Sequence, residues 1–252
     1  MDASTPAISV ERLVKLYKNT TAVDGISFSL VPGTITGLLG GNGAGKTTTI
    51  STIMGLVEPT SGQVTVLGAK MPRQRHRVLH RMNFESPYVN MPMRLTVRQN
   101  LTVFGMLYGC GDVAGRIRAL AGELDLDEFL DRQTGKLSSG QKTRVALAKS
   151  LINEPEILLL DEPTASLDPD TADWVRGRLE CYRRERRATV LLASHNMAEV
   201  ERLCDRVIML KIGRIVDDDT PARLINRYGR SNLEEVFLDI ARGRGEAREA
   251  AQ

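Results

Sequence analysis

The chain has 252 residues, of which 42% are hydrophobic and 26% are charged, as in ordinary folded proteins. Its 34 basic and 31 acidic residues nearly cancel to a net charge of +3, so we expect no nucleic-acid partner. No apolar run reaches the about 18–20 residues of a membrane-crossing helix, and the first residues lack a signal-peptide pattern. Three widely separated cysteines indicate reduced thiols in the cytoplasm rather than a disulfide framework.

In chain order, β-type runs come first, then helical patterns, then strands that alternate with helices. Short apolar runs separated by Gly, Pro and Asp predict strands at residues 8–17, 26–31, 34–40 and 62–68. A helical, leucine-rich pattern covers about residues 93–152, with Thr96 and Ser138 as candidate N-caps. Further strands are predicted at 156–163 and 189–195, and further helices at 172–182, 198–204 and 233–242. Continuous apolar strands between helices favour an α/β fold with a parallel sheet covered on both faces.

A glycine-rich segment follows the predicted strand at residues 34–40 and precedes a helical pattern. Gly40, Gly45, Lys46 and Thr47 have the spacing of a phosphate-binding loop in the context that this motif requires. Backbone N–H groups and the helix N-terminus would bind phosphate oxygens, Lys46 would reach the β- and γ-phosphates, and Thr47 would bind Mg²⁺. The predicted nucleotide-binding residues of this phosphate loop are Gly40, Gly41, Asn42, Gly43, Ala44, Gly45, Lys46, Thr47 and Thr48.

Two predicted strands end in side chains that can act on a bound nucleotide. Asp161 and Glu162 follow an apolar run, and ligands bind at the carboxyl ends of strands in open α/β sheets. We expect Asp161 to ligate Mg²⁺ and Glu162 to deprotonate the attacking water. His195 ends the next apolar run and is expected to contact the γ-phosphate. A phosphate loop alone does not separate an ATPase from a GTPase or a kinase.

Four segments together resemble the nucleotide-binding subunit of ABC transporters. They are GGNGAGKT at 40–47, LSSGQ at 137–141, ILLLDEPTASLD at 157–168 and SH at 194–195. Their order and spacing match the family from about residue 7 to residue 228. The resemblance implies a P-loop NTPase (RecA-like) core with an antiparallel β subdomain and an inserted α-helical subdomain, binding ATP and Mg²⁺. It places the core at residues 1–85 and 153–228 and the helical subdomain at about 86–152. The composition of residues 229–252 predicts a C-terminal helix and a disordered tail.

The resemblance also implies that two subunits meet head to tail. The signature loop (residues 137–141) of one subunit would then close on the ATP held by the other, through Ser138, Gly140 and Gln141. Ser139 stands where the family usually has glycine, which costs little if its φ is negative. Tyr17 stands where the family stacks an aromatic ring on adenine, with a buried core tyrosine as the alternative. Residues 166–168, which end in Asp168, match a loop that couples the two nucleotide sites.

One position departs from the family pattern. The family has a glutamine that ligates Mg²⁺ and joins the core to the helical subdomain, whereas Glu85 is the nearest match here. A carboxylate can still ligate Mg²⁺, although it adds negative charge beside the triphosphate.

We therefore expect an ATPase subunit that powers a transporter from the cytoplasmic face of the membrane, where it is peripheral. Its partners would be a second nucleotide-binding subunit, identical or paralogous, and separate integral membrane permease subunits. Resemblances at residues 233–242 and near residue 85 favour export. The alternatives are a non-transport ABC ATPase that acts on ribosomes or DNA, and a monomeric P-loop kinase or GTPase.

Overall fold

The computed structural model describes residues 5–86, 91–165 and 167–242. The chain divides into two compact units, a first unit of residues 1–75 and 189–252 and a second unit of residues 76–188. The division expected from the family, with a helical subdomain at 86–152, uses other boundaries and stays a prediction.

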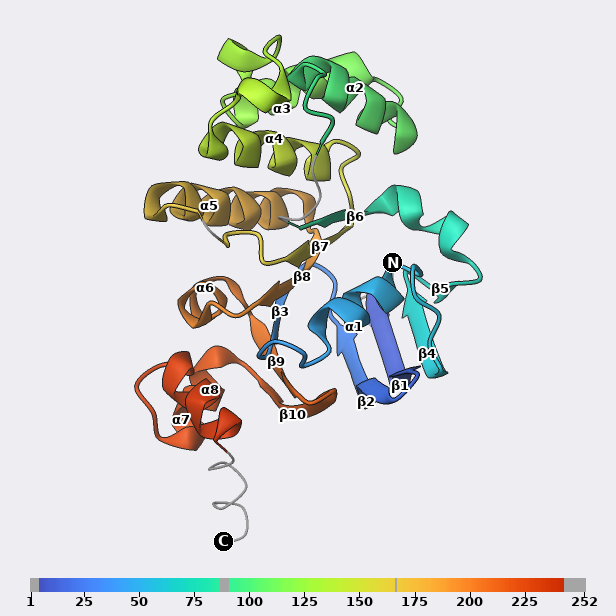
Figure 1. The fold of residues 1–252 in the computed structure, drawn as a ribbon, viewed down its shortest axis with the longest axis vertical. Helices are drawn as coiled ribbons and strands as arrows, with labels where there is room; N and C mark the ends of the chain where they lie inside the picture. Colours follow the sequence, from blue (N-terminus) through green and yellow to red (C-terminus); the bar gives the residue numbers. More distant parts are fainter. Residues whose placement is uncertain (1–4, 87–90, 166, 243–252) are drawn as a thin grey trace, which may run out of the picture. The chain divides into compact units, whose positions relative to one another are not determined.

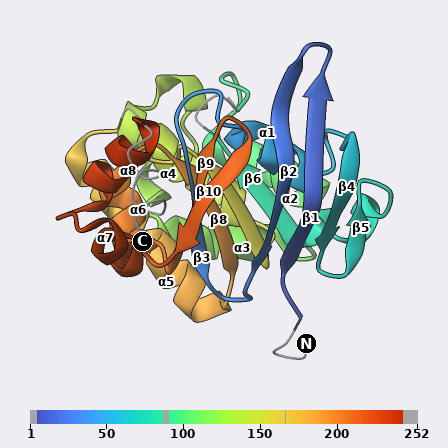
Figure 2. The same ribbon diagram turned by 90° about the horizontal axis from the view of Figure 1, so that it is seen from below.

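The first unit contains a four-stranded antiparallel sheet in the order β2-β1-β4-β5 (Figure 1). Its strands are β1 (Ile8–Tyr17), β2 (Thr20–Leu30), β4 (Ser61–Val66) and β5 (Ala69–Met71). The long β1–β2 pair is seen from another side in Figure 2. Ile8, Val10 and Leu13 of β1 are buried, and they fix which face of the sheet packs inward. This sheet is the predicted antiparallel β subdomain.

A second set of strands in the first unit carries the segments with the predicted phosphate chemistry. These strands are β3 (Ile35–Leu39), β8 (Thr189–Ser194), β9 (Arg206–Lys211) and β10 (Arg214–Asp219). Strand β3 pairs in parallel with β8 and β9, and β10 is antiparallel to β9. Every residue of β3 and β8 is buried, as the continuous apolar runs predicted. Helix α1 (Lys46–Ile53) follows β3, and helix α6 (Met197–Leu203) follows β8.

Helix α6 packs directly on the backbone of β3. A Cβ atom at Gly37 would lie 2.9 Å from Val200 Cγ1 and 3.0 Å from Cys204 Sγ. The strand and the helix therefore approach so closely that glycine is the residue that fits at this position.

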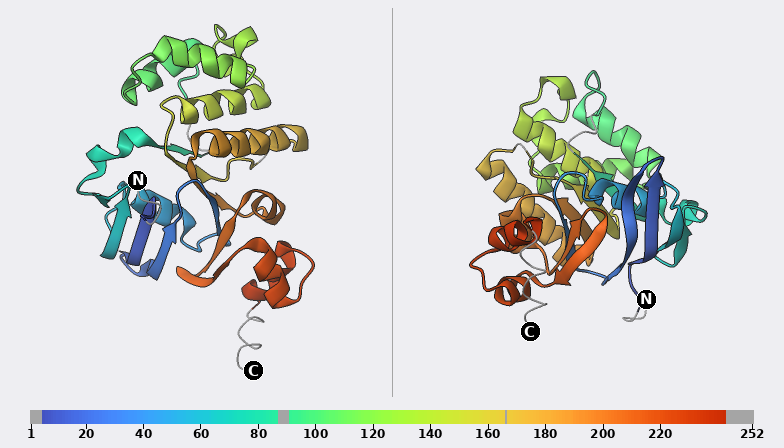
Figure 3. Two further views of the ribbon diagram at one scale, coloured as in Figure 1. Left: turned by 180° about the vertical axis from the view of Figure 1, so that it is seen from behind. Right: turned by 60° about the horizontal axis from the view of Figure 1, so that its bottom comes forward.

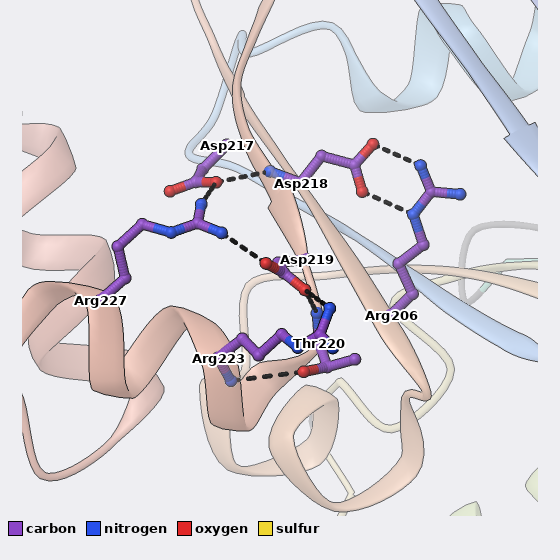
Figure 4. Close-up of polar contacts among 7 residues, drawn as sticks. All are labelled: Arg206, Asp217, Asp218, Asp219, Thr220, Arg223 and Arg227. Atoms are coloured by element: carbon purple, nitrogen blue, oxygen red, sulfur yellow. Dashed lines mark hydrogen bonds and ion pairs between the residues drawn. The ribbon is translucent and has the colours of Figure 1, made fainter.

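Two C-terminal helices, α7 (Pro221–Tyr228) and α8 (Leu233–Ala241), complete the first unit. Arg227 of α7 donates a hydrogen bond to Asp217 of β10 at 2.5 Å and also pairs with Asp219 (Figure 4). Arg206 of β9 makes a bidentate contact with Asp218, with N···O distances of 2.6 and 2.5 Å. The acidic end of β10 is therefore neutralised by arginines from the neighbouring strand and the following helix.

The second unit combines a parallel strand pair with a group of helices (Figure 3). The pair is β6 (Met82–Glu85) with β7 (Ile157–Asp161). The helices are α2 (Val97–Leu107), α3 (Val113–Glu123), α4 (Ser139–Leu151) and α5 (Pro169–Arg186). Helix α4 packs between α2 and α5. Short 3₁₀ segments lie at Leu79–Arg81, Asp127–Phe129 and Thr134–Lys136, and another, Arg75–Arg77, begins at the last residue before this unit.

The predicted helix starts at Thr96 and Ser138 are confirmed. The side chain of each residue accepts a hydrogen bond from the backbone N–H three residues later. The side chain of the glutamine at that later position accepts a hydrogen bond from the backbone N–H of the cap residue, which completes a capping box. Throughout the described ranges, no helix combines the length and the apolar character that crossing a bilayer requires.

Candidate functional site

The phosphate loop connects the buried end of β3 to α1. Gly45 has a φ of 106°, and a Cβ atom there would lie 2.5 Å from the Ala22 carbonyl oxygen, so both the conformation and the space require glycine. Lys46 begins α1 and is buried, and its Nζ donates hydrogen bonds to the carbonyl oxygens of Gly40 at 2.5 Å and Gly41 at 3.3 Å. The loop thus combines a helix N-terminus with a lysine ammonium, which is an arrangement that binds phosphate.

His195 leaves β8 at the edge of the sheet from which the phosphate loop leaves β3. Leu39 and Ser194 are register partners in the parallel pair, so the next residue of each strand emerges at the same edge. Buried Ser194 donates a hydrogen bond to Glu199 Oε2 at 2.8 Å and accepts one from the Asn196 backbone N–H at 3.0 Å. Buried Glu199, which sequence reasoning missed, therefore fixes the turn that presents the exposed His195.

Tyr17 ends β1 and has an exposed fraction of 45%, so the alternative of a buried core tyrosine is wrong. The Lys15 ammonium lies 4.9 Å from the centroid of the Tyr17 ring. Ala22, whose carbonyl oxygen borders Gly45, belongs to the other strand of the same hairpin. The structure therefore places the predicted adenine-stacking ring on a hairpin that borders the phosphate loop.

In the second unit, the carboxyl ends of β6 and β7 bring three acidic residues to one edge. Glu85 is the register partner of Leu160, so it lies beside the strand end that carries Asp161 and Glu162. Asp161 is buried. Glu162 has a φ of +55°, which is uncommon for a residue with a side chain and turns the chain sharply after the strand.

Glu85 forms a buried ion pair with Lys149 of α4. Lys149 Nζ lies 2.8 Å from Glu85 Oε2, and the two side chains are 3% and 11% exposed. Burial raises the pKa of Glu85 above its ordinary value, and the Lys149 charge partly opposes that shift. The contact ties strand β6 to the helix that begins with the signature loop. The role of Glu85 as a Mg²⁺ ligand stays a prediction.

The signature loop forms the beginning of α4. The Gln141 backbone N–H donates to Ser138 Oγ at 3.2 Å, and the Ser138 backbone N–H donates to Gln141 Oε1 at 3.1 Å. Ser139 is the first residue of the helix and is not among the residues with positive φ, so a side chain fits here as expected. A loop that opens a 13-residue helix carries the positive end of the helix dipole.

Asp168 caps α5 beside the signature loop. Its carboxylate accepts hydrogen bonds from the Thr171 backbone N–H at 3.0 Å and the Thr171 hydroxyl at 2.8 Å, and these bonds lower the pKa of Asp168. A Cβ atom at Gly140 would lie 3.3 Å from Thr171 Oγ1, so the two helix starts are in close contact. Ser166 lies outside the described residues.

Each unit therefore gathers a different part of the predicted site. The phosphate loop, the Tyr17 hairpin and His195 are close together in the first unit, whereas Glu85, Asp161 and Glu162 share an edge in the second. The strand, glycine-rich loop, lysine and helix of the first unit define a P-loop nucleotide-binding protein. Residues 23–165, more than half of the chain, match the family described as "ABC transporter". The chain belongs to this family.

Curated relatives are similar over most of their length. The chain is 37% identical to the "Nod factor export ATP-binding protein I" of Paraburkholderia xenovorans, over 92% of this chain and 76% of the relative. It is also 37% identical to the protein of the same name from Rhizobium meliloti, over 92% of this chain and 70% of the relative.

Solved structures show the same fold. The structure of an ATP-binding subunit of an ABC transporter matches with a TM-score of 0.85 at 26% identity, covering 94% of this chain and all of that chain. The cbiO1 subunit of Clostridium perfringens matches with a TM-score of 0.79 at 29% identity, covering 88% of this chain and 91% of that chain. The predicted fold is confirmed, and the chain is an ATP-binding subunit of an ABC transporter that hydrolyses ATP to drive transport.

Proposed function

We propose that this chain powers an exporter through separate membrane-spanning subunits, as a peripheral protein on the cytoplasmic face. Export is supported by the names of the relatives, which are Nod factor export proteins. Assembly is supported by two solved relatives, one a dimeric transporter cassette and the other part of a transporter complex. The dimeric cassette also supports pairing of this chain with a second nucleotide-binding subunit.

The observation that carries the proposal is that one chain offers two helix N-termini suited to phosphate. Helix α1 begins at the phosphate loop of the first unit, and α4 begins at the signature loop of the second unit. In a head-to-tail pair of subunits, α1 of one and α4 of the other would meet the same ATP. Ser138, Gly140 and Gln141 then complete the partner's nucleotide site.

Within each site, the residues have separate tasks. Tyr17 stacks on adenine, and Lys46 neutralises the β- and γ-phosphates. Glu162 takes the proton of the attacking water, and His195 contacts the γ-phosphate from the end of β8. Thr47, Asp161 and Glu85 would supply oxygen ligands of the hard type that Mg²⁺ prefers. When bound, Mg²⁺ neutralises charge that develops on the phosphate oxygens.

The signature loop gives the sharpest test of this function. Ser138→Arg places a long cation where the γ-phosphate of the partner's ATP would lie, and it removes the α4 cap. We expect ATP binding to persist while hydrolysis is lost, measured by nucleotide binding and phosphate release on the full chain. Ser139→Gly, which restores the family's usual residue, is the matched control and keeps hydrolysis. Full activity in Ser138→Arg would contradict the head-to-tail arrangement.

A further inference from the structure

A group of side chains joins the beginning of α4 to α5 and to the end of α3. Arg144 lies one turn after Gln141, and its guanidinium carbon is 4.3 Å from the ring centroid of Trp174 on α5. The same guanidinium donates hydrogen bonds from Nη1 to Asp125 Oδ2 at 2.5 Å and to the Leu124 carbonyl oxygen at 3.3 Å. Leu124 is the C-cap of α3. One arginine therefore holds three helices of the second unit together.

A second contact lies one turn earlier on the same face of α4. Gly140 borders Thr171 of α5, whose hydroxyl donates to Asp168. Residues 140 and 144 are four apart on α4, and residues 171 and 174 are three apart on α5, so each pair lies on one helix face. The two contacts therefore form a single stripe between the helices, and they fix the first turns of α4 against the start of α5.

We propose that Trp174 is a positioning residue for ATP hydrolysis. Through Arg144 it fixes the signature loop relative to Asp168, so that the two loops move as one rigid piece. The inference rests on the proposed function, because it assumes that both loops act at the nucleotide sites of a paired subunit. The effect of Trp174 passes through Arg144 and the first turns of α4.

The structure contains a matched control for this role. The guanidinium carbon of Arg178 also lies over the Trp174 ring, 5.5 Å from its centroid. Arg178 belongs to α5, as Trp174 does, so this contact cannot tie α5 to α4. If ATP hydrolysis only needed a cation beside the ring, loss of either arginine would lower kcat. If Trp174 acts by positioning α4, only loss of Arg144 should lower kcat.

The test compares the ATPase kinetics of full-chain variants. Trp174→Leu removes the aromatic face and should lower kcat about three- to tenfold, with little change in KM for ATP. We expect the KM for ATP to stay close to the wild-type value, because Lys46 and Tyr17, the proposed ground-state contacts of ATP, belong to the other unit. Trp174→Phe keeps an aromatic face and should rescue most of kcat, and Arg178→Leu should leave it unchanged.

Three further measurements separate positioning from a loss of folding. Arg144→Met should lower kcat at least as much as Trp174→Leu, because it also removes the hydrogen bonds to Asp125 and Leu124. The double variant should be no worse than Arg144→Met alone. Because Trp174 is the sole tryptophan, the difference in its fluorescence and acrylamide quenching between the wild type and Arg144→Met reports on the contact with Arg144. Thermal unfolding checks that each variant is folded at the assay temperature.

The proposal is overturned if Trp174→Leu retains the wild-type kcat, if the losses in the double variant add, or if folded Trp174→Phe does as badly as Trp174→Leu. These failures are distinct from failure of the proposed function. If Ser138→Arg abolishes hydrolysis while Trp174→Leu is neutral, the signature loop acts as proposed and the positioning role alone is wrong.

Discussion

The ammonium group of Lys149 is buried in the second unit and forms an ion pair with Glu85. Lys149→Met would leave the Glu85 carboxylate buried without that partner. Breaking a buried pair from one side typically costs about 3–5 kcal/mol, so we expect a comparable fall in the free energy of unfolding, measured with urea. The double variant Glu85→Leu/Lys149→Met should recover most of the loss. A single variant as stable as the wild type would contradict this account of the pair.

At the scale of elements, the hydrogen bonds and charges around Asp219 make the junction of β10 and α7 sensitive to pH. The Thr220 backbone N–H, and then the charges of Arg223 and Arg227, hold the pKa of Asp219 below its ordinary value of 3.8. An acid with a lowered pKa stabilises the fold fully above its unfolded pKa, and that stability is lost as the pH falls through the lowered value. Asp219→Asn should therefore lower the unfolding temperature at about pH 6 and have a smaller effect at about pH 3. An equal effect at both pH values would contradict the prediction.

Helix α2 exposes apolar side chains that suit contact with a membrane subunit. Val103, Met106 and Leu107 are 45%, 68% and 71% exposed, whereas Met91, nearby in sequence, is buried. If a cytoplasmic helix of the membrane partner docks here, Leu107→Glu should abolish transport by the assembled complex and leave ATP hydrolysis by the isolated subunit intact. Ala119→Glu at an exposed position of α3 is the control, because it makes the same change of charge. Transport that survives Leu107→Glu would place docking elsewhere.

Sequence patterns predicted most elements, because the apolar runs and helix caps that define them are local. The strands that lead to Lys46, Asp161 and His195, and the caps at Thr96 and Ser138, are all found in the structure. The pairs Glu85–Lys149 and Arg144–Trp174 were not predicted. Their members are tens of residues apart, and nothing local at either member indicates its partner. The fold thus follows from local signals, whereas the contacts that position the site depend on tertiary packing.

At the scale of the whole molecule, the proposed cycle depends on two subunits. Glu162→Gln removes the proposed general base and should slow hydrolysis by about 10²–10⁴-fold while ATP still binds. With ATP the variant should remain a dimer, because the closed pair of subunits reopens only after hydrolysis. Sedimentation of the variant with ATP, and with ADP as the control, measures this. A variant that stays monomeric with ATP, and has no second nucleotide subunit beside it in membranes, would contradict the proposal.

The close approach of α6 to β3 at Gly37 links two functional segments that are far apart in the chain. Strand β3 leads into the phosphate loop, and α6 begins two residues after His195. Any residue larger than glycine at position 37 would wedge the helix away from the strand. One added methyl group at position 37 would thereby displace both the phosphate loop that follows β3 and His195, the proposed contact of the γ-phosphate.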